Sequence, residues 1–96
     1  MGPNHVEVIR PACRFTLESR HQFSKSFKTA LQHPVIREIQ INLEHVEYMD
    51  SSAFAMVLMA RERALVDGKT VSLASPQPKI SALLEMAGFP KLFNIL

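Results

Sequence analysis

The stretch EIQINLEHVEYMDSSAFAMVLMARERA, residues 38–64, decides the fold of this chain of 96 residues. In residues 38–46 apolar and polar residues alternate, which is the period of a half-buried β-strand. Shortly afterwards the sequence becomes rich in Ala, Met and Leu, without Gly or Pro, and favours a helix. The sequence therefore predicts a strand followed closely by a helix, with an acid and two hydroxyls, Asp50, Ser51 and Ser52, in the turn.

The segments on either side repeat this alternation of strands and helices. The predicted elements are extended segments in 6–15 interrupted at Pro11, a helix in 18–32 ended by His33-Pro34, the strand from Glu38, a helix from about Ser52 to Val66, a strand at 69–75, and a helix at 76–88 with Gly88 in the C′ position. Strands alternating with helices predict a parallel sheet with helices packed on it. We expect a single small α/β domain over residues 1–96, with about four strands in a mostly parallel or mixed sheet and about three α-helices.

The composition is typical of a soluble globular domain, with 47% apolar and 21% charged residues. No apolar run approaches the roughly 18 residues of a membrane span, and the start of the sequence lacks the apolar region of a signal peptide. The only cysteine, Cys13, excludes an internal disulfide framework and fits a reducing compartment. We therefore expect a cytoplasmic protein that does not bind a membrane, with Cys13 as a buried structural thiol.

Charge is unevenly distributed along the chain. Residues 1–37 hold six Lys/Arg and two Asp/Glu, whereas residues 38–96 hold five Lys/Arg and seven Asp/Glu. A basic N-terminal part could favour an acidic partner surface or a nucleic acid, but solvated helix faces are the better explanation of scattered charges of this kind. No basic motif interleaved with aromatic residues supports nucleic-acid binding, so we expect none.

The sequence contains no common catalytic or metal-binding motif. The sequence has no Walker loop, GxGxxG, HExxH, CxxC or GxSxG motif, and its four histidines lack metal-ligand spacing. We therefore expect no enzyme activity, no catalytic residue, no cofactor and no metal, and we expect the histidines at surface or loop positions.

The turn at Asp50, Ser51 and Ser52 allows two interpretations. Asp and Ser are preferred N-caps, because their oxygens accept hydrogen bonds from the free N–H groups of a first helical turn. The same position exposes a serine hydroxyl beside the positive end of the helix dipole, where a phosphate is tolerated. Phosphorylation would add about −1.5 to −2 charges next to Asp50 and change a docking surface.

The ordered combination of motifs resembles the STAS family, the sulfate-transporter and anti-sigma-factor-antagonist domain, over essentially the whole chain. The matching stretches are INLEHVEYMDSSAFAMVLMARERA and GKTVSLASPQPKISALLEMAGFPKLFNIL. They contain a strand ending in a hydrophobic-Asp-Ser-Ser turn, an apolar helix, another strand, and an Ala-Gly-aromatic step before a Leu-Phe ending. The resemblance implies the STAS fold.

The resemblance also implies a function as an anti-sigma factor antagonist. The dephosphorylated form would bind an anti-sigma factor, often a serine kinase, and so release a sigma factor; phosphorylation at Ser51 would switch binding off, and a PP2C-type phosphatase would reset it. The sequence looks closest to small antagonists in bacterial systems controlling motility, secretion and biofilm. The alternative is a STAS subunit of a stressosome-type scaffold or of a membrane transport system. We expect a monomer and leave a weak homo-oligomer open.

The resemblance places further residues around Ser51. Asp50, Ser52 and Thr16 are its expected neighbours, with Ser52 as a helix cap and Thr16 at a position where the family often has Asp. A partner-binding surface is expected at the start of the following helix. Its hypothetical members are Met49, Ala53, Ala55, Met56 and Met59, although a helix buried on more than one side is an equally good explanation of these apolar residues.

Overall fold

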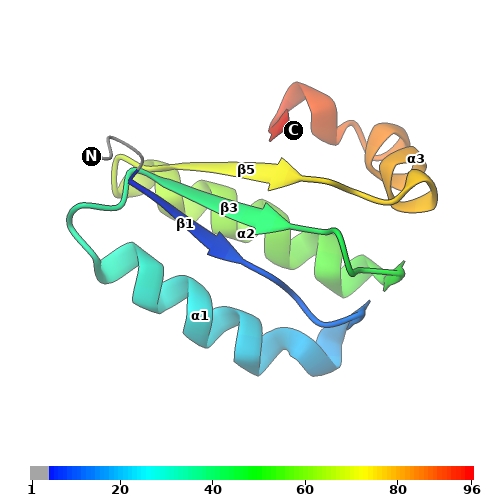
Figure 1. Cartoon of the computed structure of the whole chain (residues 1–96), viewed down its shortest axis with the longest axis horizontal. Coiled ribbons are helices and arrows are strands. Elements are labelled where there is room, and N and C mark those ends of the chain that lie inside the picture. Colours follow the sequence, from blue (N-terminus) through cyan, green and yellow to red (C-terminus); the bar gives the residue numbers. More distant parts are fainter. Residues whose placement is uncertain (1–4) are drawn as a thin grey trace.

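The computed structural model describes residues 5–96 as a parallel sheet joined by helical crossovers (Figure 1). Its strands are β1 (Val6–Ile9), β2 (Arg14–Phe15), β3 (Glu38–Asn42), β4 (Tyr48–Met49), β5 (Thr70–Ala74) and β6 (Asn94–Ile95). Its α-helices are α1 (Arg20–Gln32), α2 (Ser51–Val66) and α3 (Pro78–Met86), and its 3₁₀ turns are η1 (Leu17–Ser19) and η2 (Phe89–Lys91). The predicted α/β class and the number of α-helices are confirmed.

The main sheet has the strand order β1-β3-β5-β6, and all of its pairings are parallel. The register places Ile39 beside Val71 and Ile41 beside Leu73, so these four side chains share one face. All four are buried in the core, as the alternation in the sequence predicts. The short strands β2 and β4 pair with each other in a separate parallel ribbon.

Helices α1 and α2 supply the other half of the core. In Figure 1, α2 lies behind the sheet and α1 runs along the side of β1. Four residues at helical spacing on α2 are buried, and three of them are alanines: Ala53, Val57, Ala60 and Ala64. Such small residues let the helix approach the sheet closely. On α1 the predicted face is confirmed, because its buried residues are Phe23, Phe27, Ala30 and Leu31.

The connection from α1 to β3 is held by a buried lysine. Lys69, directly before β5, is 7% exposed. Its Nζ donates hydrogen bonds to the carbonyl oxygens of Ile36 at 2.6 Å and His33 at 3.1 Å. His33 is the C-cap of α1, where unpaired carbonyls and the helix dipole favour a cation. The ammonium group therefore ties the end of α1 to the start of β5.

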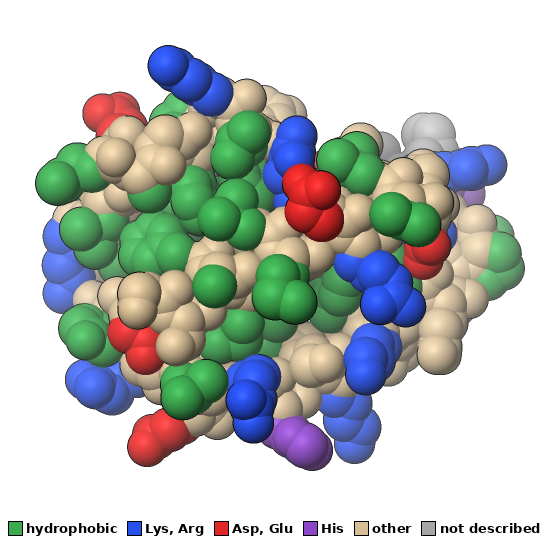
Figure 2. Space-filling model, turned by 180° about the vertical axis from the view of Figure 1, so that it is seen from behind, with side chains coloured by type: hydrophobic (Ala, Val, Ile, Leu, Met, Phe, Trp, Pro, Cys, Tyr) green, Lys and Arg blue, Asp and Glu red, His purple; other side chains and the backbone are tan. Residues whose placement is uncertain are grey.

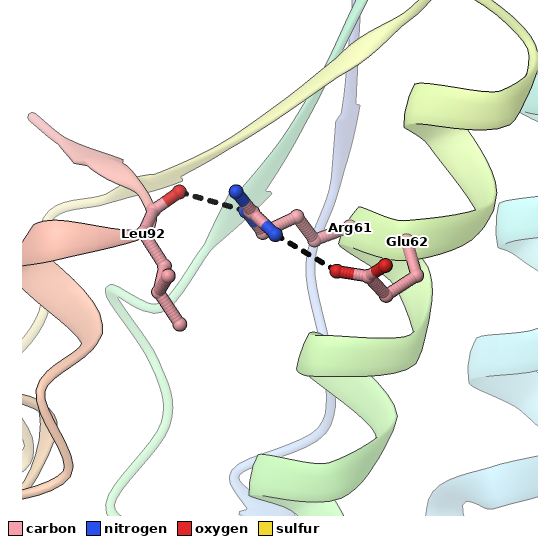
Figure 3. A network of polar contacts seen from close by, with 3 residues as sticks. All are labelled: Arg61, Glu62 and Leu92. Atoms are coloured by element: carbon pink, nitrogen blue, oxygen red, sulfur yellow. Dashed lines mark hydrogen bonds and ion pairs between the residues drawn. The ribbon is translucent and has the colours of Figure 1, made fainter.

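The C-terminal segment adds a strand that the sequence did not predict. After α3, Gly88 adopts the left-handed conformation (φ 77°), as expected for the C′ position, and the chain passes through η2 into β6. Arg61 of α2 reaches this segment, since its Nε donates to the carbonyl oxygen of Leu92 at 2.9 Å (Figure 3). Its guanidinium also pairs with Glu62 at 2.8 Å.

Two further findings concern the expectations for Cys13 and for membrane segments. Cys13 is exposed, so its predicted role as a buried thiol is wrong. It lies just before β2, and its carbonyl oxygen accepts hydrogen bonds from the N–H groups of Glu47 (2.9 Å) and Tyr48 (3.3 Å), so its backbone rather than its side chain contributes to the fold.

Within residues 5–96 we find no helix with the length and apolarity that crossing a membrane requires.

Candidate functional site

The β2–β4 ribbon brings the beginnings of two helical segments together. In its register Phe15 lies beside Met49, so the residues that follow each strand leave the ribbon at the same end. The N–H of Asp50 donates to the carbonyl oxygen of Phe15 at 3.4 Å and fixes this alignment. After β2 the chain continues into η1 and α1, and after β4 it continues into α2. The predicted turn therefore lies where both helical segments start.

Asp50 connects the two segments through its carboxylate. Oδ1 accepts a hydrogen bond from the N–H of Ala53 at 2.9 Å, which makes Asp50 the N-cap of α2. Oδ2 accepts one from the N–H of Leu17 at 3.2 Å, at the start of η1. The expected cap role of Ser52 is wrong, because Asp50 already occupies the cap position and Ser52 lies inside the first turn.

Ser51 is the exposed member of the turn. It is the first residue of α2, and its side chain is exposed, whereas Ser52 is partly buried and Ala53 fully buried. The first N–H groups of an α-helix have no partner within the helix and carry the positive end of its dipole. Ser51 thus combines an accessible hydroxyl with a position that suits an anion, while the adjacent Asp50 is already engaged in the fold.

Thr16 lies in the segment that faces the turn. It is the N-cap of η1, and its hydroxyl accepts a hydrogen bond from the N–H of Glu18 at 3.3 Å. The Ser19 hydroxyl accepts in return from the N–H of Thr16 at 3.3 Å, which completes a capping box. Because Leu17, the next residue, is bonded to Asp50, the structure brings Thr16 into the neighbourhood of the turn.

Three exposed residues beside the turn were not identified from the sequence. The Arg14 guanidinium carbon lies 4.7 Å from the centre of the Tyr48 ring, in a cation–π contact across the β2–β4 ribbon. Leu17 is 53% exposed although it is apolar. Tyr and Arg are enriched among residues that dominate protein interfaces, which makes this pair notable. Alternation along the two short strands could have identified Arg14 and Tyr48 as outward-facing residues, but strands of two residues leave almost no periodic signal.

The structure divides the expected partner-binding residues into two groups. Met49 and Ala53 are buried in the core, 5% and 0% exposed, so their side chains cannot form part of a surface and this expectation is wrong. Ala55 and Met59 are exposed, and Met56 is partly buried at the surface of α2. One side of α2 is therefore buried and another carries exposed apolar side chains, and a partner-binding role of the exposed residues stays a prediction.

The titratable residues that the structure describes form no recognisable metal site. Among residues 5–96 there is no group of three or more His, Cys, Asp or Glu side chains placed to hold a metal ion. The four histidines are all exposed, at the surface or loop positions expected for them.

Comparison with known proteins identifies relatives over nearly the whole chain. The family model described as "Mlab, STAS domain" matches residues 3–95. The STAS-domain containing protein PA14_20770 of Pseudomonas aeruginosa strain UCBPP-PA14 is 29% identical over 82 residues, which cover 85% of this chain and 79% of the relative.

Solved structures show the same fold at low sequence identity. The crystal structure of a candidate anti-sigma factor antagonist from Thermotoga maritima has a TM-score of 0.82 and 21% identity, and the match covers 95% of this chain and 78% of the other. The phosphorylated form of the Bacillus cell fate determinant SpoIIAA has a TM-score of 0.72 and 21% identity, covering 100% and 86%. A sulfate transporter family protein from Wolinella succinogenes has a TM-score of 0.76 and 14% identity, covering 98% and 75%.

Proposed function

The chain belongs to the STAS domain family, and on this basis we propose that it is an anti-sigma factor antagonist switched by phosphorylation of Ser51. The dephosphorylated form binds an anti-sigma factor of the serine-kinase type and releases a sigma factor. Phosphorylation of Ser51 ends this binding, and a PP2C-type phosphatase restores it. The protein acts by binding a partner and not by catalysis.

The observation that supports this proposal best is the exposure of Ser51 on a rigid turn. Its neighbour Asp50 is fixed by three hydrogen bonds of its backbone N–H and carboxylate, and Ala53 is buried. A kinase can reach the Ser51 hydroxyl while the backbone around it stays in place. The likeness to SpoIIAA, whose structure is known in a phosphorylated form, is in keeping with this role.

The charge of a phosphate explains how binding is lost. An interface centred on the turn excludes water around Ser51, where a hydroxyl needs only one or two hydrogen bonds. A phosphate needs several donors, and it stands beside the Asp50 carboxylate, which repels it. Mispairing a buried charge at an interface costs about 2–5 kcal/mol, which corresponds to roughly 30- to several thousand-fold in affinity.

The test measures both the site of modification and its effect. The protein is incubated with the copurifying kinase and ATP, and the modified residue is located by intact mass and fragmentation. Binding to that partner is then titrated for wild type, Ser51→Ala and Ser51→Glu. We expect Ser51→Ala to bind but escape modification, and Ser51→Glu to bind at least about tenfold more weakly.

A matched charge control separates the turn from general electrostatics. Ser26 is an exposed serine on α1, and Ser26→Glu adds the same charge away from the turn. We expect this variant to bind like wild type. Modification of Ser52 with Ser51 unmodified contradicts the assignment of the phosphosite, and equal affinities of Ser51→Ala and Ser51→Glu contradict the mechanism.

A second candidate function is a STAS subunit of a stressosome-type scaffold or of a membrane transport system. The likeness to a sulfate transporter family protein favours it, although at 14% identity that likeness concerns the fold alone. The exposed Ser51 makes the antagonist the better proposal. Affinity purification from the native host distinguishes them, because an antagonist brings down an anti-sigma factor, whereas a transport subunit brings down a permease or its ATPase.

A further inference from the structure

A groove of about 300 Å³ runs between α1 and α2. Its apolar lining comes from both helices, namely Phe23, Phe27 and Leu31 of α1 and Met56, Met59 and Ala60 of α2. Met59 is 70% exposed, so an apolar side chain with a flexible thioether stands at the edge of the groove. Figure 2, which views the molecule from behind Figure 1, shows hydrophobic side chains of this side next to Lys and Arg side chains.

The charges along the groove have one sign. Arg20, Lys28 and Arg63 line it, and no Asp or Glu does. Helix α1 as a whole carries Arg20, Lys25 and Lys28 but no acid. Three cations around an apolar floor complement a ligand that has an apolar side flanked by carboxylates, and they disfavour a basic ligand.

The groove begins close to the Ser51 turn. The Asp50 bridge to Leu17 holds the starts of α1 and α2 together, and Arg20 is the first residue of α1. Met56 lies about one and a half turns along α2 from Ser51. A partner that covers the turn can therefore also reach the groove.

We propose that this groove binds an amphipathic helix of the anti-sigma partner, with its apolar side between α1 and α2 and its Asp and Glu side chains opposite Arg20, Lys28 and Arg63. A helix suits the site because a third helix laid along two packed helices buries apolar residues at i, i+3, i+4 and i+7. This proposal rests on the proposed function for the identity of the partner, but it does not involve the phosphate.

The test uses a designed peptide and the full chain in its unphosphorylated form. The peptide has about 16 residues, roughly four helical turns, with Leu and Phe on one face and Glu on the other. Two matched peptides have Lys in place of Glu, or the same residues in scrambled order. Binding is followed by fluorescence anisotropy, and the site is mapped by amide chemical shifts of the labelled protein.

We expect the Glu peptide to bind with a Kd of about 10–100 µM and to shift amide signals of α1 and α2. The Lys peptide and the scrambled peptide should bind at least about tenfold more weakly. Equal binding of the Glu and Lys peptides, or shifts confined to other elements, would overturn the proposal.

Matched variants test the groove itself. Met59→Glu and Arg63→Glu should each weaken the Glu peptide about tenfold or more. Met86→Glu on α3 replaces another exposed methionine, 84% exposed, and is the control for Met59→Glu. Lys79→Glu, also on α3, replaces another helical cation and is the control for Arg63→Glu. Both control variants should bind like wild type. The dispersion of the amide spectrum verifies that each variant is folded, and Arg63 provides an independent test if Met59→Glu is not.

Vesicles of anionic phospholipid form the last arm of the experiment. If wild type cosediments with the vesicles, Arg63→Glu does not, and the Glu peptide does not bind, the groove binds a membrane surface and the proposal is overturned. The Ser51 experiment is independent of these results. If the Glu peptide binds the groove but Ser51 does not control partner binding, only the proposed function is contradicted. If Ser51 controls partner binding but the Glu peptide does not bind the groove, only this inference is contradicted.

Discussion

The Asp50 carboxylate links the N–H of Ala53 at 2.9 Å to the N–H of Leu17 at 3.2 Å, so one side chain holds the starts of two helical segments. The residues that it joins are 36 positions apart in the sequence, and the adjacent Ser51 is exposed. A new negative charge on Ser51 acts first on this carboxylate. We therefore expect a phosphate on Ser51 to affect the position of the η1 segment through this link.

Asp50→Ala should lower the free energy of unfolding by about 2 kcal/mol, because it removes an N-cap and a hydrogen bond to a charged group. Asp50→Ser keeps a capping oxygen for Ala53 but has no second oxygen for Leu17, so it should cost about 1 kcal/mol. Urea denaturation measures both. Asp67→Ala, at the other end of α2, is the control and should stay within about 0.5 kcal/mol. A stability of Asp50→Ser equal to that of wild type would show that the Leu17 bond contributes nothing.

Thr16→Asp should leave the unphosphorylated protein nearly as stable as wild type, because Asp caps η1 as well as Thr does. In the protein phosphorylated on Ser51 it should lower the thermal midpoint, since it adds a carboxylate near the phosphate. Thr16→Asn supplies a neutral cap as a control. Differential scanning calorimetry of both forms measures the effect, and a phosphorylated Thr16→Asp protein as stable as phosphorylated Thr16→Asn would contradict it.

Lys69→Met should lower the free energy of unfolding by about 2–3 kcal/mol. It keeps the apolar stem but removes the ammonium group from the carbonyl oxygens of Ile36 and His33, of which His33 still accepts a hydrogen bond from the N–H of Ile36. Lys79→Met, on the exposed side of α3, is a matched control and should have an effect below about 0.5 kcal/mol. Chemical denaturation that gives the same value for the two variants would mean that Lys69 acts only through its stem.

Arg61→Ala should loosen the C-terminal segment more than the rest of the molecule. It removes the bond from Nε to the carbonyl oxygen of Leu92, and the expected loss of global stability is about 1 kcal/mol. Native-state hydrogen exchange should show faster exchange in β6 and η2, with β3 unchanged. Arg63→Ala, two residues along α2, removes a cation without such a bond to this segment. Similar exchange rates in the two variants would rule out a specific role of Arg61.

The central elements could be predicted because their patterns are long. The alternation that begins at Glu38 and the helical spacing of the α1 face follow directly from the burial of one side of a strand or helix, although β3 ends at Asn42 and not at Val46 as the alternation predicted. Gly88 was placed correctly because the left-handed conformation after a helix strongly favours glycine. The resemblance to the STAS family identified the fold without a structure.

The missed features depend on contacts between distant parts of the chain. Asp50 rather than Ser52 caps α2, because the chain enters the helix one residue earlier than the pattern suggested, and propensity does not distinguish these two residues. The strands β4 and β6 have two residues each, too few for a periodicity, whereas β2 lies in the second extended segment predicted in 6–15. The sequence neighbours of Cys13 and Met49 do not determine how exposed these side chains are, because their exposure is set by where the β2–β4 ribbon lies.

The parallel register of the sheet also sets the order in which the molecule assembles. β1, β3 and β5 pair residues that are roughly thirty positions apart, such as Val6 with Glu38 and Glu38 with Thr70. Each pairing must close a long loop that contains a helix, so chain entropy is lost before the hydrogen bonds between the strands can offset it. The Asp50–Leu17 bond needs such a closure too. We therefore expect folding on the millisecond scale or slower, with the helices formed early and the Ser51 turn among the last parts to become native.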